Sequence, residues 1–185
     1  RVLFRSIEQP IPELDKNNSI YMITFGGDTG TFGADSSKLA KYQDSILVTE
    51  DTTKQLVGER KLNLLFRASR DGFAASKFHE LCDNKGPILV IVKANNRIAG
   101  GFSPISWQSS GGYTSVPNGD AFLWTIDSQN NISRYSNNND KYGPNQNKYS
   151  LNFQSNLGPW FGGGPDLGIN DTGNTSVPWT YTISS

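Results

Sequence analysis

The sequence predicts a single α+β domain rich in antiparallel β-structure, and three observations support this. Of the 185 residues, 35% are apolar and 18% are charged, while 19 glycines and abundant asparagine indicate many turns. Segments rich in β-branched and aromatic residues recur along the chain, whereas helical patterns are few and short. Strands and helices do not alternate as a parallel sheet requires. We therefore expect an α+β, β-rich fold, either an antiparallel sheet covered by helices or a sandwich.

The N-terminal segment contains one clear predicted strand. Most of residues 19–25 (SIYMITF) are β-branched or aromatic, which favours a strand. Prolines interrupt the chain before it, so the first residues should form an irregular arm, and a glycine-rich loop follows it. A short helix over residues 36–42 and a brief strand over residues 46–48 are expected next.

A helix and a strand are predicted after this segment. Thr49 suits the N-cap of a helix that ends near Gly58, because the acidic residues Glu50 and Asp51 follow in its first turn. Residues 62–67 (LNLLFR) then have the composition of a strand.

A second helix is predicted over residues 73–81. Ala74, Phe78 and either Leu81 or Cys82 recur at helical spacing, so they should share one buried face. Further strands are expected at residues 88–93, a continuous apolar run typical of a strand covered on both faces, at 97–102, joined to it by an Asn-Asn turn, and at 121–126.

The C-terminal third contains an asparagine-rich excursion followed by more strand material. Short strands are expected around Arg134 and over residues 149–153. Residues 158–164 (GPWFGGG) read as a glycine turn around two aromatic side chains. The last strands are predicted at residues 167–170 and 179–183.

Charge and cysteine content exclude several classes of protein. Seventeen basic and seventeen acidic residues leave no net charge, which argues against a nucleic-acid or polybasic membrane partner. Cys82 is the single cysteine, so no internal disulfide can form. The longest apolar run is too short to span a bilayer, and no signal-peptide-like segment lies near the N-terminus. We expect a soluble, cytoplasmic protein with no membrane insertion.

Metal and hydrolytic sites have little support. His79 and Cys82 would share a helix face, and Asp83 could add an oxygen, but a structural zinc site needs about four such ligands. We therefore expect no metal and no cofactor. A Ser69, Asp71 and His79 set can be written down, although no Gly-x-Ser-x-Gly nucleophile elbow is present.

Simpler roles account for the remaining chemical patterns. Asp71 would cap the helix that begins near Phe73, neutralised by Arg67 or Arg70. The Asp-Thr-Gly triplets at residues 28–30 and 171–173 lack the apolar strand that precedes the aspartic-protease aspartate, and the triple glycine lacks the Lys and Ser/Thr of a phosphate loop. We expect no catalytic residue.

From about residue 45 onward, the chain resembles the TLDc domain family. The resemblance rests on a series of short motifs in order: LLFRASRDGF at residues 64–73, then Phe78-His79 and Cys82-Asp83, KGP at 85–87, GGF at 100–102, Trp107, AFL at 121–123, and GP and FGGG with DL in the region 158–167. The matching residues singled out are Arg67, Ser69, Arg70, Asp71, Gly72, Phe73, His79, Cys82, Asp83, Gly100, Gly101, Gly162, Gly163 and Gly164.

The resemblance implies a two-sheet antiparallel β-sandwich flanked by short helices. It divides the chain into an N-terminal extension, residues 1–44, whose strand packs on the core, and a TLDc-like domain, residues 45–185. The family's closing strand has no counterpart here, which would leave an open sheet edge. Either residues 19–25 or a partner chain should fill that edge.

The leading functional interpretation is a non-enzymatic protein-interaction module. The resemblance associates the family with protection against oxidative stress and with binding the vacuolar proton-pumping ATPase (V-ATPase), so V-ATPase subunits are the implied partners. Asp71, Arg70, Glu80 and the turn at residues 162–166 are the expected surface contacts.

Alternative functions remain open from the sequence alone. The chain could be a structural component paired with neighbouring chains in a larger assembly, or a weak hydrolase. It could also be a thiol peroxide scavenger centred on Cys82, although burial on its helix would keep that thiol inert. A sugar-binding sandwich would use the aromatic side chains Trp107, Tyr113, Trp124, Trp160 and Trp179, which core packing explains better.

Overall fold

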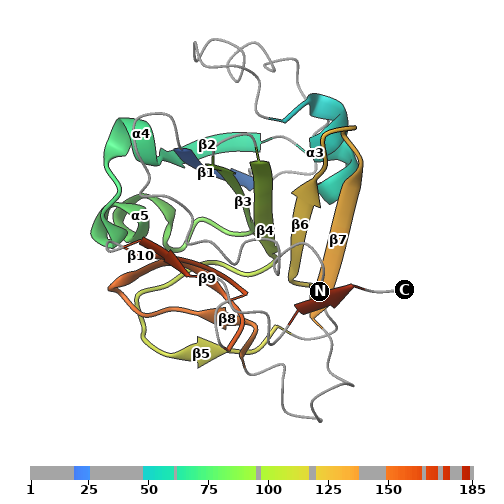
Figure 1. Cartoon of the computed structure of the whole chain (residues 1–185). Coiled ribbons are helices and arrows are strands. Elements are labelled where there is room, and N and C mark those ends of the chain that lie inside the picture. Colours follow the sequence, from blue (N-terminus) through green and yellow to red (C-terminus); the bar gives the residue numbers. More distant parts are fainter. Residues whose placement is uncertain are drawn as a thin grey trace.

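Two antiparallel sheets stack on each other in the computed structural model (Figure 1), which describes residues 19–25, 48–60, 62–94, 97–116, 120–137, 149–163, 166–170, 173–175 and 181–183. The larger sheet has seven strands in the order β12-β7-β6-β4-β3-β1-β2, and the smaller has five in the order β11-β10-β9-β8-β5. The α+β, β-rich sandwich that the sequence predicted is thereby confirmed.

The described strands are β1 (Ser19–Phe25), β2 (Leu62–Arg67), β3 (Ile88–Ala94), β4 (Arg97–Ser103), β5 (Tyr113–Thr114), β6 (Phe122–Ile126), β7 (Ile132–Asn137), β8 (Leu151–Asn152), β9 (Leu157–Phe161), β10 (Leu167–Asn170), β11 (Gly173–Thr175) and β12 (Tyr181–Ile183), and the helices are α3 (Glu50–Val57), α4 (Ala68–Asp71) and α5 (Ala75–Cys82).

Strand β3 lies inside the larger sheet, between β4 and β1, and is buried on both faces. Ile88 and Val90 belong to the core between the two sheets, together with Phe161 of the smaller sheet. Leu89 and Ile91 point the other way, into a second apolar cluster that contains Leu56 of α3. The continuous apolar run is therefore explained as predicted, because alternate side chains enter two different cores.

The helices begin and end for local reasons. The Thr49 side chain accepts a hydrogen bond from the Thr52 amide at 3.1 Å, and Gly58 ends α3 with a positive φ of 74°. The second predicted helix is present as α5, which packs against β2 of one sheet and β9 of the other. The N-cap of α5 is Ala74, which makes no side-chain cap bond. The prediction that Asp71 caps this helix is therefore wrong.

Strand β1 lies inside the larger sheet. It pairs antiparallel with β3 on one side and with β2 on the other, with a register shift against β2 between Met22 and Ile23. Among the described strands β2 pairs with β1 alone, so β1 joins β2 to the rest of the sheet. The strand predicted at residues 19–25 is thus present, at an interior position of the sheet.

Other predicted elements have different bounds in the structure or lie outside the residues that it describes. Residues 158–161, expected in a glycine turn, continue strand β9, because Phe161 is buried in the inter-sheet core and the turn starts only at Gly162. The strand predicted over residues 149–153 is limited to β8. The helix expected at residues 36–42 lies outside the described residues, as do residues 46 and 47 of the brief strand expected over 46–48, and residue 48 is not in a strand.

Candidate functional site

Most of the motif residues gather where α4 and α5 follow β2, at one end of the larger sheet (Figure 1). Helix α4 starts directly after β2, and Gly72 ends it with a φ of 95° and a bond from its amide to the Ala68 carbonyl. Phe73 follows and is 38% exposed. This short connection therefore presents one aromatic side chain to solvent beside a strand edge.

Arg70 and Asp71 form a compact ion pair on this connection. The Arg70 guanidinium donates from Nε to Asp71 Oδ1 at 2.6 Å and from Nη2 to Oδ2 at 2.7 Å. The bonds from Arg70, opposed in part by burial, together with the bond from the Arg67 amide, hold the pKa of the Asp71 carboxyl below its ordinary value. Asp71 is thereby kept as a carboxylate. Arg70 neutralises it, and Arg70 was one of the two partners, with Arg67, that the sequence predicted.

The same pair also covers part of the edge of β2. Asp71 Oδ2 accepts from the Arg67 amide at 2.8 Å, and Arg70 Nη2 donates to the Leu65 carbonyl at 3.3 Å. The carbonyl of one strand residue and the amide two residues later point to the same side of a strand. The two side chains thus bond the backbone groups that a further strand would bond.

His79 connects α5 to the turn between β8 and β9. Its Nδ1 lies 2.8 Å from Asp83 Oδ1, and its Nε2 lies 2.9 Å from the Leu157 carbonyl and 3.2 Å from the Gln154 carbonyl. The side chain is 6% exposed. Since both ring nitrogens contact protein oxygens, neither is available to take a proton from a nucleophile. His79 is a cross-link between helix and sheet.

The hydrolytic set considered from the sequence is not assembled. The partner of His79 is Asp83, whereas Asp71 bonds Arg67 and Arg70. A hydroxyl does approach the cluster, because Ser109 Oγ donates to Asp83 Oδ2 at 2.5 Å, but it contacts the carboxylate and not the imidazole. The side chain of Ser69 lies outside the description. This order of groups does not activate a serine.

Asp83 also anchors the long loop that follows β4. Besides the Ser109 bond, the Asn84 amide donates to the Trp107 carbonyl and the Gly86 amide donates to Ser106 Oγ, both at 2.9 Å. These contacts hold the segment 104–112 against the connection between α5 and β3. Hydrogen bonds with residues 83–86 therefore hold this loop in place.

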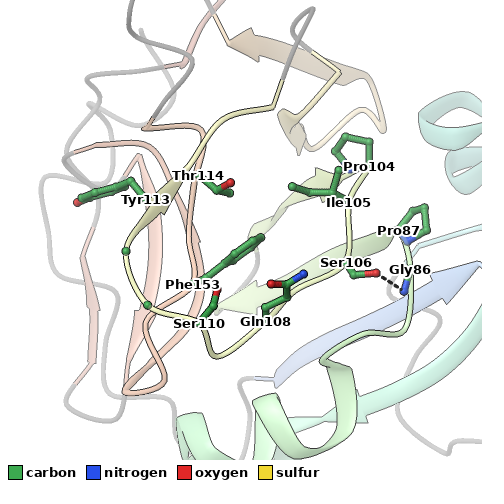
Figure 2. A pocket seen from close by; sticks show the side chains of 12 residues that line it. Gly86, Pro87, Pro104, Ile105, Ser106, Gln108, Ser110, Tyr113, Thr114 and Phe153 are labelled. Atoms are coloured by element: carbon green, nitrogen blue, oxygen red, sulfur yellow. Dashed lines mark hydrogen bonds between the residues drawn. The ribbon is translucent and has the colours of Figure 1, made fainter.

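An open pocket of about 610 Å³ lies between this loop and β5 (Figure 2). Ile105, Thr114 and Phe153 provide apolar surface, and Gln108 and Ser110 provide polar groups. Its volume is in the range of small-ligand sites in proteins. The sequence analysis did not find this pocket; the Ser-Ser-Gly-Gly run beside it, at residues 109–112, is a turn signal that was not used.

A comparison with family models decides the family. The model described as TLDc domain matches residues 33–182. The chain belongs to the TLDc family. Searches of curated proteins and of solved structures gave no match. The match begins at residue 33, whereas the sequence analysis placed the start of the domain at residue 45. Strand β1 precedes the matched span. The domain boundary at residue 45 stays a prediction.

The glycines of the TLDc motifs serve close packing. A Cβ on Gly100 would overlap the Val90 carbonyl and the Trp124 ring, and a Cβ on Gly101 would lie 2.5 Å from the Phe161 ring. Gly162 has a φ of 93°, and a Cβ there would overlap the Asp166 carboxylate. These glycines are needed because neighbouring groups contact the backbone directly.

The turn at residues 162–166 was expected on the surface, and its described ends are not there. Asp166 is 1% exposed and Gly162 is buried. Gly163 is half-buried, and its carbonyl accepts from the Tyr113 hydroxyl at 2.9 Å. Gly164 lies outside the described residues. The expectation that Gly162 and Asp166 make surface contacts is wrong, because the aspartate folds back under the turn.

The thiol of the TLDc chain is fully buried. Cys82 is 0% exposed, and burial, with the nearby Asp83 and Asp71 charges, raises the pKa of its thiol far above the ordinary value. A thiol that reacts with peroxide needs the opposite setting, exposed and electropositive. This environment does not support a peroxide scavenger centred on Cys82.

The aromatic side chains considered for sugar binding mostly belong to the core. Trp107 and Trp124 are both 0% exposed, and Trp160 is half-buried. Tyr113 is 42% exposed, and Trp179 lies outside the described residues. Within the described ranges no three His, Cys, Asp or Glu side chains gather as metal ligands, and no helix there is long and apolar enough to cross a membrane.

Proposed function

We propose that this TLDc chain is a non-enzymatic protein-interaction module whose partners are subunits of the V-ATPase, and that it contributes through this binding to protection against oxidative stress. The observation that carries the proposal is where the motif residues lie in the fold. His79, Cys82 and Asp71, the groups best suited to chemistry, are bonded or buried inside the fold.

The outward-facing side of the same motifs supplies the proposed contact surface. Phe73 is partly exposed beside the exposed Arg70, and Lys77 and Glu80 form an exposed ion pair at 2.6 Å on the outside of α5. Aromatic side chains and arginine are enriched at the core of protein interfaces, and other charged groups lie mainly at the rim. We define this surface, Arg70, Phe73, Lys77 and Glu80, as the α4–α5 face.

A pull-down from a lysate containing the V-ATPase tests the proposal. The tagged chain should enrich pump subunits, and Phe73→Ser should reduce that enrichment about tenfold, the effect of losing one interface anchor. Gln129→Ser is the control, since Gln129 is exposed in the turn between β6 and β7, belongs to neither α4 nor α5 and does not line the pocket beside β5.

Two results would contradict the proposal. Absence of pump subunits from the wild-type pull-down would remove the V-ATPase as partner. Equal enrichment by wild type and Phe73→Ser would move the contact away from the α4–α5 face. The proposal places the chain in the cytoplasm, where cell fractionation should recover it together with the soluble part of the pump.

The oxidative-stress role has its own test. Cells that depend on this chain for survival in peroxide should survive equally well with Cys82→Ser, because the proposed protection acts through binding and not through the thiol. Loss of protection by a Cys82→Ser protein that accumulates normally would favour the scavenger interpretation instead.

A further inference from the structure

Strand β5 ends the smaller sheet. In the strand order β11-β10-β9-β8-β5 it pairs with β8 on one side, and no described strand pairs with its other side. The strand is two residues long and lies directly beside the 610 Å³ pocket. A sheet edge next to a pocket is the arrangement by which several domains bind an extended peptide.

A bulge sets the direction of the backbone groups of β5. The Gly111 amide donates to the Phe153 carbonyl at 3.1 Å, and the Phe153 amide donates to the Gly112 carbonyl at 2.9 Å, so two residues oppose one. Both glycines have positive φ, 81° and 83°, which other residues adopt only with strain. The bulge therefore fixes which residues of β5 face β8.

Alternation along the strand then identifies the outward groups. The Val116 amide bonds Ser150 Oγ at 3.2 Å, on the side of β8, and Thr114 lies opposite Leu151. Tyr113 and Ser115 are the intervening residues, so their amides and carbonyls point away from β8. No described strand pairs with these groups, and they point to the side where an incoming strand would bond.

The lining of the pocket limits what could bind there. None of its twelve residues is charged, so a charged side chain would lose water without gaining a partner. Figure 2 shows the Phe153 ring and Ile105 directed toward the space between β5 and the loop, while the Tyr113 ring points away from it. Gln108 and Ser110 make no side-chain hydrogen bond with any other described residue.

We propose that the pocket beside β5 binds an extended, uncharged peptide segment of another protein, which pairs with the outward backbone groups of Tyr113 and Ser115. One apolar side chain of the peptide contacts Phe153 and Ile105, and Gln108 bonds its backbone. This site is separate from the α4–α5 face and does not depend on the identity of the V-ATPase as a partner.

Selection from a library of random twelve-residue peptides, using the purified full chain, tests the proposal. The selected peptides should share an uncharged segment. In amide-resolved spectra they should shift Tyr113, Ser115 and Gln108, and they should slow hydrogen exchange at the Tyr113 and Ser115 amides about tenfold or more.

Two lysine substitutions provide the matched pair. Gln108→Lys puts a charge at the uncharged pocket and should weaken the selected peptides about tenfold, about 1.4 kcal/mol. Gln129→Lys is the control, because Gln129 is an exposed glutamine in the turn between β6 and β7 and does not line the pocket. It should leave the affinity unchanged.

Several outcomes would overturn the proposal. These are no enriched peptide, enriched peptides that carry charges through the bound segment, an affinity unchanged by Gln108→Lys, or shifts confined to residues outside the pocket. Peptides that shift Phe73 and α5 instead would support the α4–α5 face while rejecting this site. Failure of the pump pull-down would leave this proposal unaffected.

Discussion

At the scale of single residues, Gly100 and Gly101 show most directly how the TLDc motifs act. They are consecutive in β4, so a Cβ on each would point to opposite faces of the larger sheet. Trp124 contacts the backbone on one face and Phe161, from the smaller sheet, on the other. Two adjacent glycines thus let an aromatic ring approach the strand from each side.

Gly101→Ala should therefore lower the free energy of unfolding by about 2 kcal/mol, because its methyl group would collide with the buried Phe161 ring. The measurement is urea denaturation. In the double variant with Phe161→Leu, the added cost of the alanine should become smaller, since the smaller side chain can yield. Strictly additive costs would show that the two side chains do not meet.

Cys82 allows a second residue-scale prediction. Because burial raises the pKa of its thiol and excludes reagents, iodoacetamide at mildly alkaline pH should alkylate the folded chain very slowly. The same reaction should be fast in concentrated urea, where the thiol is exposed. Mass spectrometry follows both rates. Rapid alkylation of the folded chain would contradict the buried position.

At the scale of elements, the Arg70–Asp71 pair protects an edge. Strand β2 ends the larger sheet in the described part of the chain, and exposed strand edges promote association between molecules. The pair bonds the Leu65 carbonyl and the Arg67 amide, which would otherwise accept a neighbouring strand. The Arg70–Asp71 pair therefore protects the exposed edge of β2.

Replacing both members, Arg70→Ala with Asp71→Ala, should cause concentration-dependent self-association, measurable by analytical ultracentrifugation. Lys77→Ala with Glu80→Ala is the matched control, because it also removes one positive and one negative exposed charge but leaves β2 untouched. The control should sediment like the wild type. Equal behaviour of the two double variants would show that the edge is not what the Arg70–Asp71 pair protects.

Asp71 also makes a pH-dependent contribution to stability. Its pKa in the folded chain is lowered below the ordinary value of 3.8, so its stabilisation is present above that pH and is lost as the pH falls through the lower, folded-state pKa. Asp71→Asn should cost about 1 kcal/mol near neutral pH, a modest value for a partly exposed group.

Chemical denaturation at a series of pH values measures this contribution. The difference between wild type and Asp71→Asn should be constant above about pH 5 and should shrink at more acid pH, once the carboxyl is protonated in both states. A difference that stays the same down to about pH 2 would mean that the charge of Asp71 is not what stabilises the connection.

Element by element, local patterns predicted well what local forces decide. The Thr49 cap, the apolar run of β3 and the helix around Phe78 follow from sequence spacing, and each is present. The end of β9 could not be predicted, because Phe161 enters the core through contacts with distant residues, among them Gly101, 60 positions earlier in the chain, and Trp107. The bonds of His79 to the Leu157 and Gln154 carbonyls, and the pocket beside β5, likewise depend on distant segments meeting.

At the scale of the whole molecule, the TLDc motifs build a sandwich that one strand from outside the matched span completes. Strand β1 lies between β3 and β2, and in the described structure β2 has no other strand partner. Without β1, β2 would lose its pairing with the larger sheet and α4 would follow an unattached strand, while α5 would keep its contacts with β9. The α4–α5 face, where we propose that partners bind, therefore depends on a strand near the N-terminus.

Hydrogen exchange at the amides of residues 21–24, measured by NMR on the full isolated chain, tests this arrangement most directly. Because β1 is paired on both sides, these amides should exchange as slowly as those of Val90 and Ile91 in β3. Exchange at the rate of an unstructured peptide, while β3 and β4 remain protected, would contradict the account: β1 would then not be a strand of this sheet.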